Sequence, residues 1–247
     1  GDWVCDDAVM VGMEAQQNWL EATLGPWFNN TLFDVDLRPD MRAEGLVSAA
    51  VESWAGQQLD VRWSYSSDDR LLVDDLEGAD APDINQMGLT NTFSGFREYR
   101  ACYGENCGQS FEHDRGAVIL KWDEDEVADA SFGLQGVRAS AYPYLSFRIT
   151  SRDENWNRDR DTHDAMLRLR DADGNEGTIM LSAVQRILHG YETGHVMDTL
   201  QTVRVDIAKL TALAPDLDLD NLDEFILTFP VDGLQGAVYV SDLAFTF

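Results

Sequence analysis

Four arginines in a chain that is otherwise poor in positive charge could bind anions. Arg148, Arg168, Arg170 and Arg204 occupy alternating positions in segments that read as β-strands, and alternate residues of a strand point to the same side. Guanidinium groups hold carboxylate or sulfate through paired hydrogen bonds. A row of them on neighbouring strands predicts either a binding surface for an acidic polysaccharide or a salt-bridge ladder with local Asp and Glu.

Aromatic residues in polar surroundings form the second candidate group. Trp156 lies in the loop 151–158 among charged and amide side chains, where no core role is evident from the sequence. A flat ring can lie against the C–H side of a pyranose while its polar neighbours reach the hydroxyls. Trp156 is therefore the first candidate for a sugar platform, and Tyr142 and Tyr191 are weaker ones. The alternative is that Trp156 belongs to the core.

Two cysteines close in sequence predict a small disulfide. Cys102 and Cys107 are separated by Tyr-Gly-Glu-Asn, a segment flexible enough to close a ring. Metal ligation would need two more Cys or His at suitable spacing, and none is nearby. The bridge would leave Cys5 unpaired. A structural disulfide favours a secreted or extracellular protein, or a periplasmic one.

Sequence signatures of catalysis are missing from the chain. It contains no Gly-x-Ser-x-Gly elbow, no His-Glu-x-x-His, no phosphate-cradling loop and no dinucleotide fingerprint. Its histidines, His113, His163, His189 and His195, are placed irregularly and suit the surface better than a metal site. A glycosidase needs a pair of carboxyl groups, but no pair stands out among 45 acidic residues. Binding is therefore favoured over catalysis.

The charge balance limits the partners. The chain has 18 basic and 45 acidic residues, a net charge of -27, and its surface would repel nucleic acid phosphates and anionic lipids. No apolar run reaches the roughly 18 residues of a membrane span. Dense carboxylates with scarce lysine favour solubility in salt, as in a halophilic or marine source. An ordinary acidic extracellular protein is the alternative.

The hydrophobic pattern changes near residue 68. Apolar residues fall at helical spacing in 7–22 and 42–54, so 1–68 is predicted to be a partly helical N-terminal segment. Residues 69–247 show short runs rich in β-branched and aromatic residues, separated by turns, and they predict an all-β sandwich or barrel. The expected strands are 117–122, 145–150, 165–170, 178–181, 202–207, 225–229 and 237–247, with a hairpin turn at 173–175. Residues expected in the core are Leu145, Phe147, Ile149, Ala165, Leu167, Leu169, Tyr239, Leu243, Phe245 and Phe247.

A series of short motifs in this second region resembles the jelly-roll carbohydrate-binding modules of the galactose-binding-domain-like superfamily. The motifs are Leu71–Glu77 followed by Asn85 and Gly88, then Arg115–Trp122, Tyr144–Arg148, Leu169–Gly174 and the closing strand Gly236–Phe245. The resemblance implies a jelly-roll β-sandwich over residues 69–247. It also implies a module that stands beside a catalytic domain in a secreted polysaccharide-degrading or esterase-type enzyme.

The resemblance further implies a calcium ion. In many such modules calcium ties the first strand to the last, and the matching carboxylates here are Asp75, Glu77 and Asp242, with Asp114 as a further candidate. Calcium takes roughly six to eight oxygen ligands. The family pattern often has a second acid where this chain has Ser241. The alternative is that these acids are solvated strand ends.

We therefore expect a non-catalytic polysaccharide-binding module of a secreted, multidomain hydrolase. Two alternatives belong to other classes: a jelly-roll glycoside hydrolase or polysaccharide lyase, and a structural or interaction module of an extracellular protein. An enzyme should have a deep groove lined with paired acids. A binding module should have a shallow aromatic platform, and a structural module should have neither.

Overall fold

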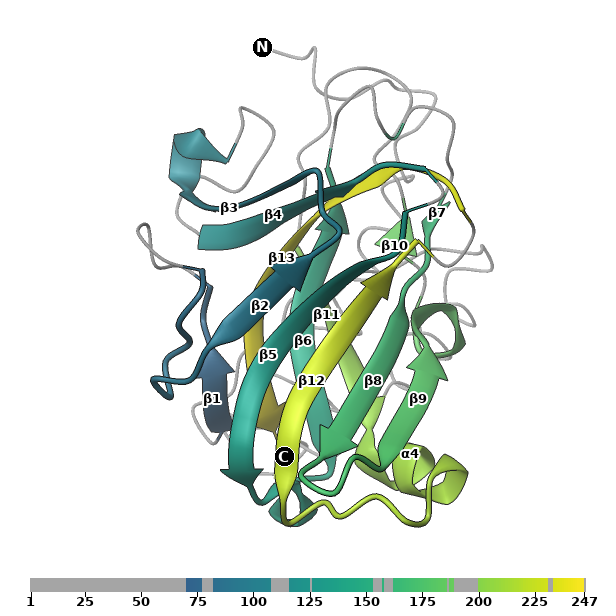
Figure 1. The fold of residues 1–247 in the computed structure, drawn as a ribbon. Helices are drawn as coiled ribbons and strands as arrows, with labels where there is room; N and C mark the ends of the chain where they lie inside the picture. The colour runs from purple at the N-terminus through teal and green to yellow at the C-terminus, as the bar shows by residue number, and fades with distance from the viewer. Residues whose placement is uncertain are drawn as a thin grey trace, which may run out of the picture. The chain divides into compact units, whose positions relative to one another are not determined.

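The computed structural model describes residues 70–76, 82–107, 116–124, 126–152, 157, 162–185, 187–188, 200–230 and 233–246. The chain divides into two units, Gly1–Trp63 and Ser64–Phe247, and all described residues belong to the second. The predicted segment 1–68, with Cys5, lies outside them. The described residues form two antiparallel sheets that lie one behind the other (Figure 1).

We call the sheet nearer the viewer in Figure 1 the front sheet and the other the back sheet. The front sheet has the order β2 (Asn91–Ser94), β5 (Ala128–Val137), β12 (Leu222–Phe229), β8 (Met166–Asp171) and β9 (Glu176–Met180). The back sheet has the order β11 (Gln201–Asp206), β6 (Tyr144–Ser151), β13 (Gly236–Thr246), β4 (Gly116–Trp122) and β3 (Glu98–Tyr103), and β1 (Arg70–Asp74) also pairs with β13.

The remaining elements are short. Strands β7 (Thr162–His163) and β10 (Ile187–Leu188) form a small pair. The helical elements are η2 (Gly104–Asn106), η3 (Ala139–Ala141), η5 (Leu181–Ala183) and α4 (Ile207–Leu213). Helix α4 begins where the Asp206 carboxylate accepts a hydrogen bond from the Ala208 N–H, which caps the first turn. None of the helices in the described part of the chain is long and apolar enough to span a membrane.

From β4 onward, and apart from β9, which forms a hairpin with β8 in the front sheet, successive long strands alternate between the two sheets: β4, β6, β11 and β13 lie in the back sheet and β5, β8 and β12 in the front sheet. This is the jelly-roll sandwich expected from the sequence, and strands lie at the seven predicted segments. Five described strands were not predicted: β2, β3, β5, β7 and β10. Strand β5 contains Gly133 and Gly136 together with alanines, which have low β-propensity, so its alternation carried little signal.

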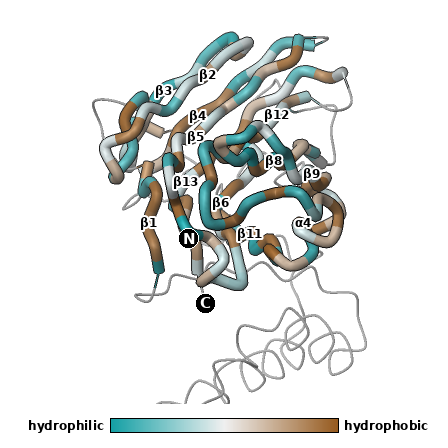
Figure 2. The backbone as a smooth tube through the Cα atoms, turned by 60° about the horizontal axis from the view of Figure 1, so that its bottom comes forward, coloured by the Kyte–Doolittle hydropathy of each residue, from teal (hydrophilic) through white to brown (hydrophobic). Residues whose placement is uncertain are grey.

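The core lies between the sheets, where aromatic side chains from both layers meet. Trp122 and Phe229 stack with ring centroids 4.5 Å apart, and Phe147 of the back sheet lies 5.7 Å from Phe225 of the front sheet. The described residues predicted for the core are all buried. Figure 2 shows hydrophobic stretches along the strands of both sheets, alternating with hydrophilic ones. Burial of this apolar surface is the main stabilising contribution.

A β-bulge in the last strand reverses which residues face the core. The register of β13 against β6 shifts between Ser241 and Ala244, and Asp242 has a φ of 56°. Val238 and Val240 face the core before the bulge, whereas Leu243 and Phe245 face it afterwards. Tyr239 is therefore buried on the outer side of the back sheet, in a separate cluster. Simple alternation predicts one phase for the whole strand, and the extra residue of a bulge breaks it.

Candidate functional site

The outward side of the front sheet carries three rows of side chains that cross its strands. We call this surface the front face. Its rows follow from the strand register and are Gly133, Glu224, Arg170 and Glu176; Ser131, Ile226, Arg168 and Thr178; and Asp129, Thr228, Met166 and Met180. The residues between them in sequence, such as Phe225 and Leu167, point into the core.

Arg168 is at the centre of the front face and binds across three strands. Its Nη2 lies 2.7 Å from Asp129 Oδ1 and donates to Thr228 Oγ1 at 2.8 Å. The Thr228 hydroxyl in turn donates to the same Asp129 oxygen at 2.5 Å. Arg168 Nη1 also lies 3.6 Å from Glu176 Oε2. The guanidinium plane is thereby held in a fixed orientation, with a side chain that is 15% exposed.

Arg170 extends this network toward the other end of the sheet. Its Nη1 lies 2.5 Å from Glu224 Oε1, and its Nη2 lies 3.1 Å from Glu176 Oε2. Glu224 also accepts a hydrogen bond from the Ser131 hydroxyl. Desolvation lowers the pKa of Arg170, but hydrogen bonds and charge from Glu176 and Glu224 outweigh it and raise the pKa above its usual value. The result is a fully charged arginine that is held by two carboxylates.

The four arginines that the sequence puts on one face lie on two faces. Arg168 and Arg170 are on the front sheet, whereas Arg148 and Arg204 are on strands β6 and β11 of the back sheet. The prediction of a single row is wrong because strands that follow each other in a jelly roll alternate between sheets. The alternative, a salt-bridge ladder, describes the front face.

The two arginines of the back sheet have local partners. Arg148 is 3% exposed, with its Nε 3.4 Å from Asp242 Oδ2. The guanidinium carbon of Arg204 lies 3.9 Å from the centroid of the Tyr144 ring, a cation–π contact. Burial makes Arg148 unsuitable for contact with a polymer in solvent.

Of the three aromatic candidates, Tyr142 alone lies among the described residues, and it is not on the front face. Trp156 and Tyr191 lie outside the described residues, and their roles stay predictions. Tyr142 borders a hollow of about 410 Å³ between η3 and α4, together with Asp206, Thr211 and Leu219. Asp206 is already used as the cap of α4. Among the described side chains of the front face none is aromatic.

The described residues do not fit the predicted calcium site. The Asp242 carboxylate lies between two arginines, 2.5 Å from Arg70 Nη1 and 3.4 Å from Arg148 Nε. The Asp75 carbonyl accepts hydrogen bonds from the Ser241 hydroxyl and the Asp242 N–H. Two guanidinium groups so close to the carboxylate would repel a divalent cation. Glu77 and Asp114 lie outside the described residues, so their part in a metal site stays a prediction.

Two buried polar groups resemble catalytic groups but hold the structure together. Burial raises the pKa of Asp74 to about 6, although the Leu76 N–H and the Asn91 amide donate to its carboxylate. The His163 ring lies 3.0 Å from the Ser151 hydroxyl. Both side chains of this pair are at most 2% exposed, so no substrate could reach them. His163 was expected at the surface and is instead part of the core beside Trp122.

The predicted disulfide is confirmed. Cys102 and Cys107 are bonded and close a ring around η2. The Tyr239 hydroxyl donates to the Cys107 carbonyl at 2.6 Å, and Arg100 Nη1 donates to the Asn106 carbonyl at 3.2 Å. The bridge and these hydrogen bonds fix the segment that follows β3.

Sequence reasoning missed the carboxylates of the front face. The turn at 173–175 was predicted, and counting outward from it places Glu176 opposite Arg170. That pair could have been found from the hairpin alone. Glu224 and Asp129 come from strands distant in sequence, and no local signal brings them to Arg170 and Arg168.

No protein-family model matches the sequence, and no curated protein matches it. Similar solved structures include a family 11 carbohydrate-binding module from Clostridium thermocellum in complex with a β-1,3-1,4-mixed-linked tetrasaccharide, with 12% identity, a TM-score of 0.46 and coverage of 73% of this chain and 97% of that chain. A family 30 carbohydrate-binding module has 13% identity, a TM-score of 0.49 and coverage of 72% and 87%. An exo-β-agarase has 13% identity and a TM-score of 0.48, with coverage of 70% of this chain and 24% of the enzyme. Similarity at this level carries neither a family nor a ligand over to the chain.

Proposed function

We propose that the jelly-roll sandwich is a non-catalytic polysaccharide-binding module and that its front face is the binding surface. The observation that carries the proposal is the network of Arg168 and Arg170 with three carboxylates on the outward side of the front sheet. Arg170 is 34% exposed and Glu176 is 28% exposed, so a ligand in solvent can reach them. The ordered motifs that resemble carbohydrate-binding modules give independent support.

Such a network suits sugar hydroxyls. Each hydroxyl is at once a donor and an acceptor, so neighbouring hydroxyls of a pyranose can donate to a carboxylate and accept from a guanidinium. Glu176 and Arg170 present these two groups side by side, 3.1 Å apart. Because the ion pairs hold both groups in place, little side-chain entropy is lost when the ligand binds.

The same contacts disfavour glycoside hydrolysis on this face. A glycosidase needs one carboxyl group that delivers a proton and a second on the opposite side of the scissile bond. Glu176, Glu224 and Asp129 instead accept hydrogen bonds from arginine. All three project from the same side of one sheet, so they do not face each other across a bound glycan. The enzyme alternative is therefore less well supported than binding. The expected aromatic platform is not seen among the described residues of this face either, so it is the partly exposed Arg170–Glu176 pair that favours binding over a structural or interaction module.

We further propose that the protein works outside the reducing cytoplasm, beside a catalytic domain of a secreted hydrolase. The Cys102–Cys107 disulfide favours an oxidising compartment. The adjacent catalytic domain follows from the resemblance to modules that bring such a domain to its substrate.

Affinity electrophoresis through gels that contain soluble polysaccharides tests the proposal. The parent chain should be retarded by at least one polysaccharide, without release of reducing sugar. Replacing Arg170→Ala should remove most of the retardation, because the hydroxyl-binding pair with Glu176 is lost. The matched control is Arg100→Ala on β3 of the back sheet, where the Arg100 Nε lies 3.0 Å from Glu98 Oε1. Because this pair is not on the front face, the control should migrate like the parent. Equal retardation of all three proteins would contradict the proposal, as would release of reducing sugar.

A further inference from the structure

We infer that the ligand of the front face is a neutral glycan that stacks on a pair of methionines, Met166 and Met180. The inference rests on the proposed function and names the class of ligand and the groups that would contact its apolar side.

The charge of the front face argues against an acidic ligand. Arg168 and Arg170 contribute two positive charges, and Asp129, Glu176 and Glu224 contribute three negative ones, so the network has a net charge of -1. Each guanidinium already has a carboxylate oxygen within 2.7 Å. A ligand carboxylate or sulfate would have to displace an internal one and would come to lie among like charges, at an energetic cost.

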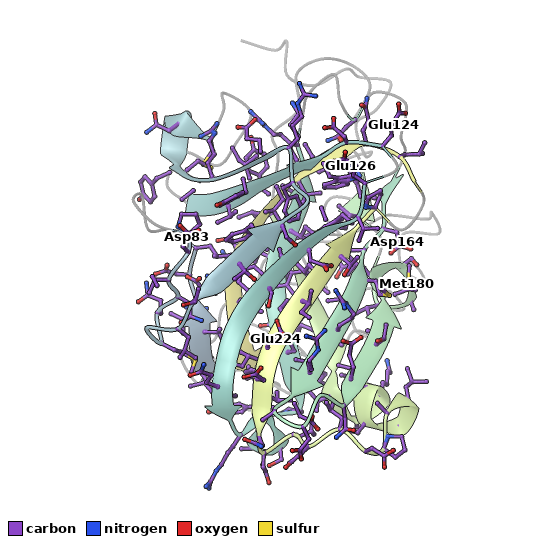
Figure 3. The ribbon with its side chains drawn as sticks, viewed as in Figure 1. Asp83, Glu124, Glu126, Asp164, Met180 and Glu224 are labelled. Carbon is purple, nitrogen blue, oxygen red and sulfur yellow. A yellow bond between two sulfur atoms is a disulfide. The ribbon has the colours of Figure 1, made fainter. Side chains whose placement is uncertain are left out.

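Acidic side chains also surround the face. Figure 3 shows Asp164, Glu124 and Glu126 toward the upper end of the front sheet and Asp83 on its left side, with Glu224 on the face itself. Glu124 and Glu126 precede β5, and Asp164 precedes β8. An anionic polymer that crosses the sheet would pass these carboxylates at either end, whereas a neutral polymer would meet donors and acceptors without repulsion.

Ile226 on this face is buried, so the accessible apolar part of the described rows is the methionine pair. Met166 and Met180 are directly opposite each other on β8 and β9, a position in which cross-strand side chains touch. Both side chains are half-buried, and Figure 3 shows Met180 at the right edge of the front sheet. They follow Asp129 and Thr228 in the same row. The row thus places an apolar surface beside polar groups.

Thioether side chains suit this role. Methionine is flexible and polarizable and adapts to irregular apolar surfaces, so a pair of them can cover the C–H side of a pyranose. The hydroxyls on the edge of the same sugar would then reach the arginine and carboxylate rows. This division of apolar and polar contacts within one sheet face gives a neutral sugar two kinds of interaction at once.

The experiment compares the parent chain with Met166→Ala/Met180→Ala on neutral and acidic polysaccharides. The neutral probes are a mixed-linkage β-glucan and agarose, and the acidic probes are alginate and a sulfated carrageenan. We expect the parent to bind a neutral probe, with affinity that changes little between low and high salt. The double variant should bind about tenfold more weakly, because apolar contact area is lost, while its melting temperature stays close to that of the parent.

Two further variants sharpen the result. Met166→Leu/Met180→Leu keeps the apolar volume and should retain most of the affinity. Leu213→Ala on α4 removes an apolar side chain that is 65% exposed and lies outside the front face, and it should bind like the parent. Neutral binding that the alanine pair leaves unchanged would overturn the inference. The inference would also be overturned if the parent preferred an acidic probe and high salt abolished that binding. In that case the front face would still be a glycan site. Absence of binding to all four probes would overturn the proposed function and the inference together.

Discussion

The side chain of Asp242 joins three strands of the back sheet. It sits at the bulge of β13, where Arg70 of β1 and Arg148 of β6 reach its two oxygens. Calcium was expected at this position from the sequence, and here two guanidinium groups supply positive charge to the carboxylate. Breaking a buried pair leaves an uncompensated charge, so this cluster should matter for stability even though it contacts no ligand.

Removal of metal should therefore have no effect on stability. We expect the melting temperature with excess EDTA to equal that with excess calcium. Arg148→Met should lower the free energy of unfolding by about 3 kcal/mol, because Asp242 loses one of its two partners in a buried site. Differential scanning calorimetry measures both. A midpoint that rises with calcium would show that a metal binds, with Glu77 and Asp114 as the residues to test.

The buried carboxyl of Asp74 should make stability depend on pH. Burial raises its pKa from 3.8 to about 6 in the folded state, so folding favours the protonated form. This contribution is fully present below pH 3.8 and is lost as the pH rises through 6; it amounts to about 3 kcal/mol. Urea unfolding at pH 4 and pH 7 measures it. Because pH 4 lies slightly above 3.8, the difference in unfolding free energy between the parent and Asp74→Asn should shift by most of this amount, about 2 kcal/mol, in favour of the variant at pH 7. Parallel pH curves would contradict the assignment.

At the scale of elements, connections between strands are held by side chains that bind backbone. Asp171 closes the β8–β9 turn by accepting a hydrogen bond from the Asn175 N–H at 2.8 Å. It also connects this turn to the loop between α4 and β12 by accepting a hydrogen bond from the Asp218 N–H at 2.9 Å. The hydrogen bond from Asp218 is the main reason why the pKa of Asp171 lies below its usual value. In the same way, Asn85 holds the loop before β2 by donating to the Gly133 carbonyl of β5 at 2.8 Å.

The start of β13 leaves no room for a side chain. A Cβ at Gly236 would lie 2.3 Å from Trp122 Cζ2 and 2.9 Å from the His163 ring. Gly236→Ala should lower the free energy of unfolding by about 3 kcal/mol, since a packed core accommodates extra volume only by shifting backbone. Chemical denaturation of the parent, the two single variants and the double variant Gly236→Ala/Trp122→Leu provides the check. Gly236→Ala should lower the free energy of unfolding less when residue 122 is the smaller leucine. Strictly additive changes would show that the clash with the Trp122 ring is not the cause.

At the scale of the whole molecule, electrostatic repulsion opposes the compact state. The net charge of -27 is spread over a chain in which the described arginines are largely taken up in local ion pairs. Salt shortens the range of the remaining repulsion. The same excess of carboxylates keeps the molecules apart in solution, and this favours the solubility in salt that the composition indicates.

Raising sodium chloride from about 0.05 M to about 1 M should raise the melting temperature at pH 7 by roughly 3 °C, equivalent to about 1 kcal/mol. The control is the same series near pH 4.2, the isoelectric point of the sequence. The net charge is close to zero there, so the salt effect should largely disappear. A fall in melting temperature with salt at pH 7 would mean that the surface ion pairs outweigh the overall repulsion.

The sequence by itself determined the features that depend on neighbouring residues. Alternation in 145–150 and 165–170 located the strands and their buried sides, and the spacing of Cys102 and Cys107 indicated the disulfide. Composition established the acidity. These features are local or additive, so they can be read without knowing which segments meet.

Only the tertiary structure decided which strands share a sheet. It separated Arg148 from Arg168, brought Glu224 to Arg170, placed two arginines around Asp242 and buried His163. The bulge at Asp242 also reversed the phase of the last strand. The physical reason is that a jelly roll pairs strands distant in sequence, and the period of a single strand carries no information about its partner.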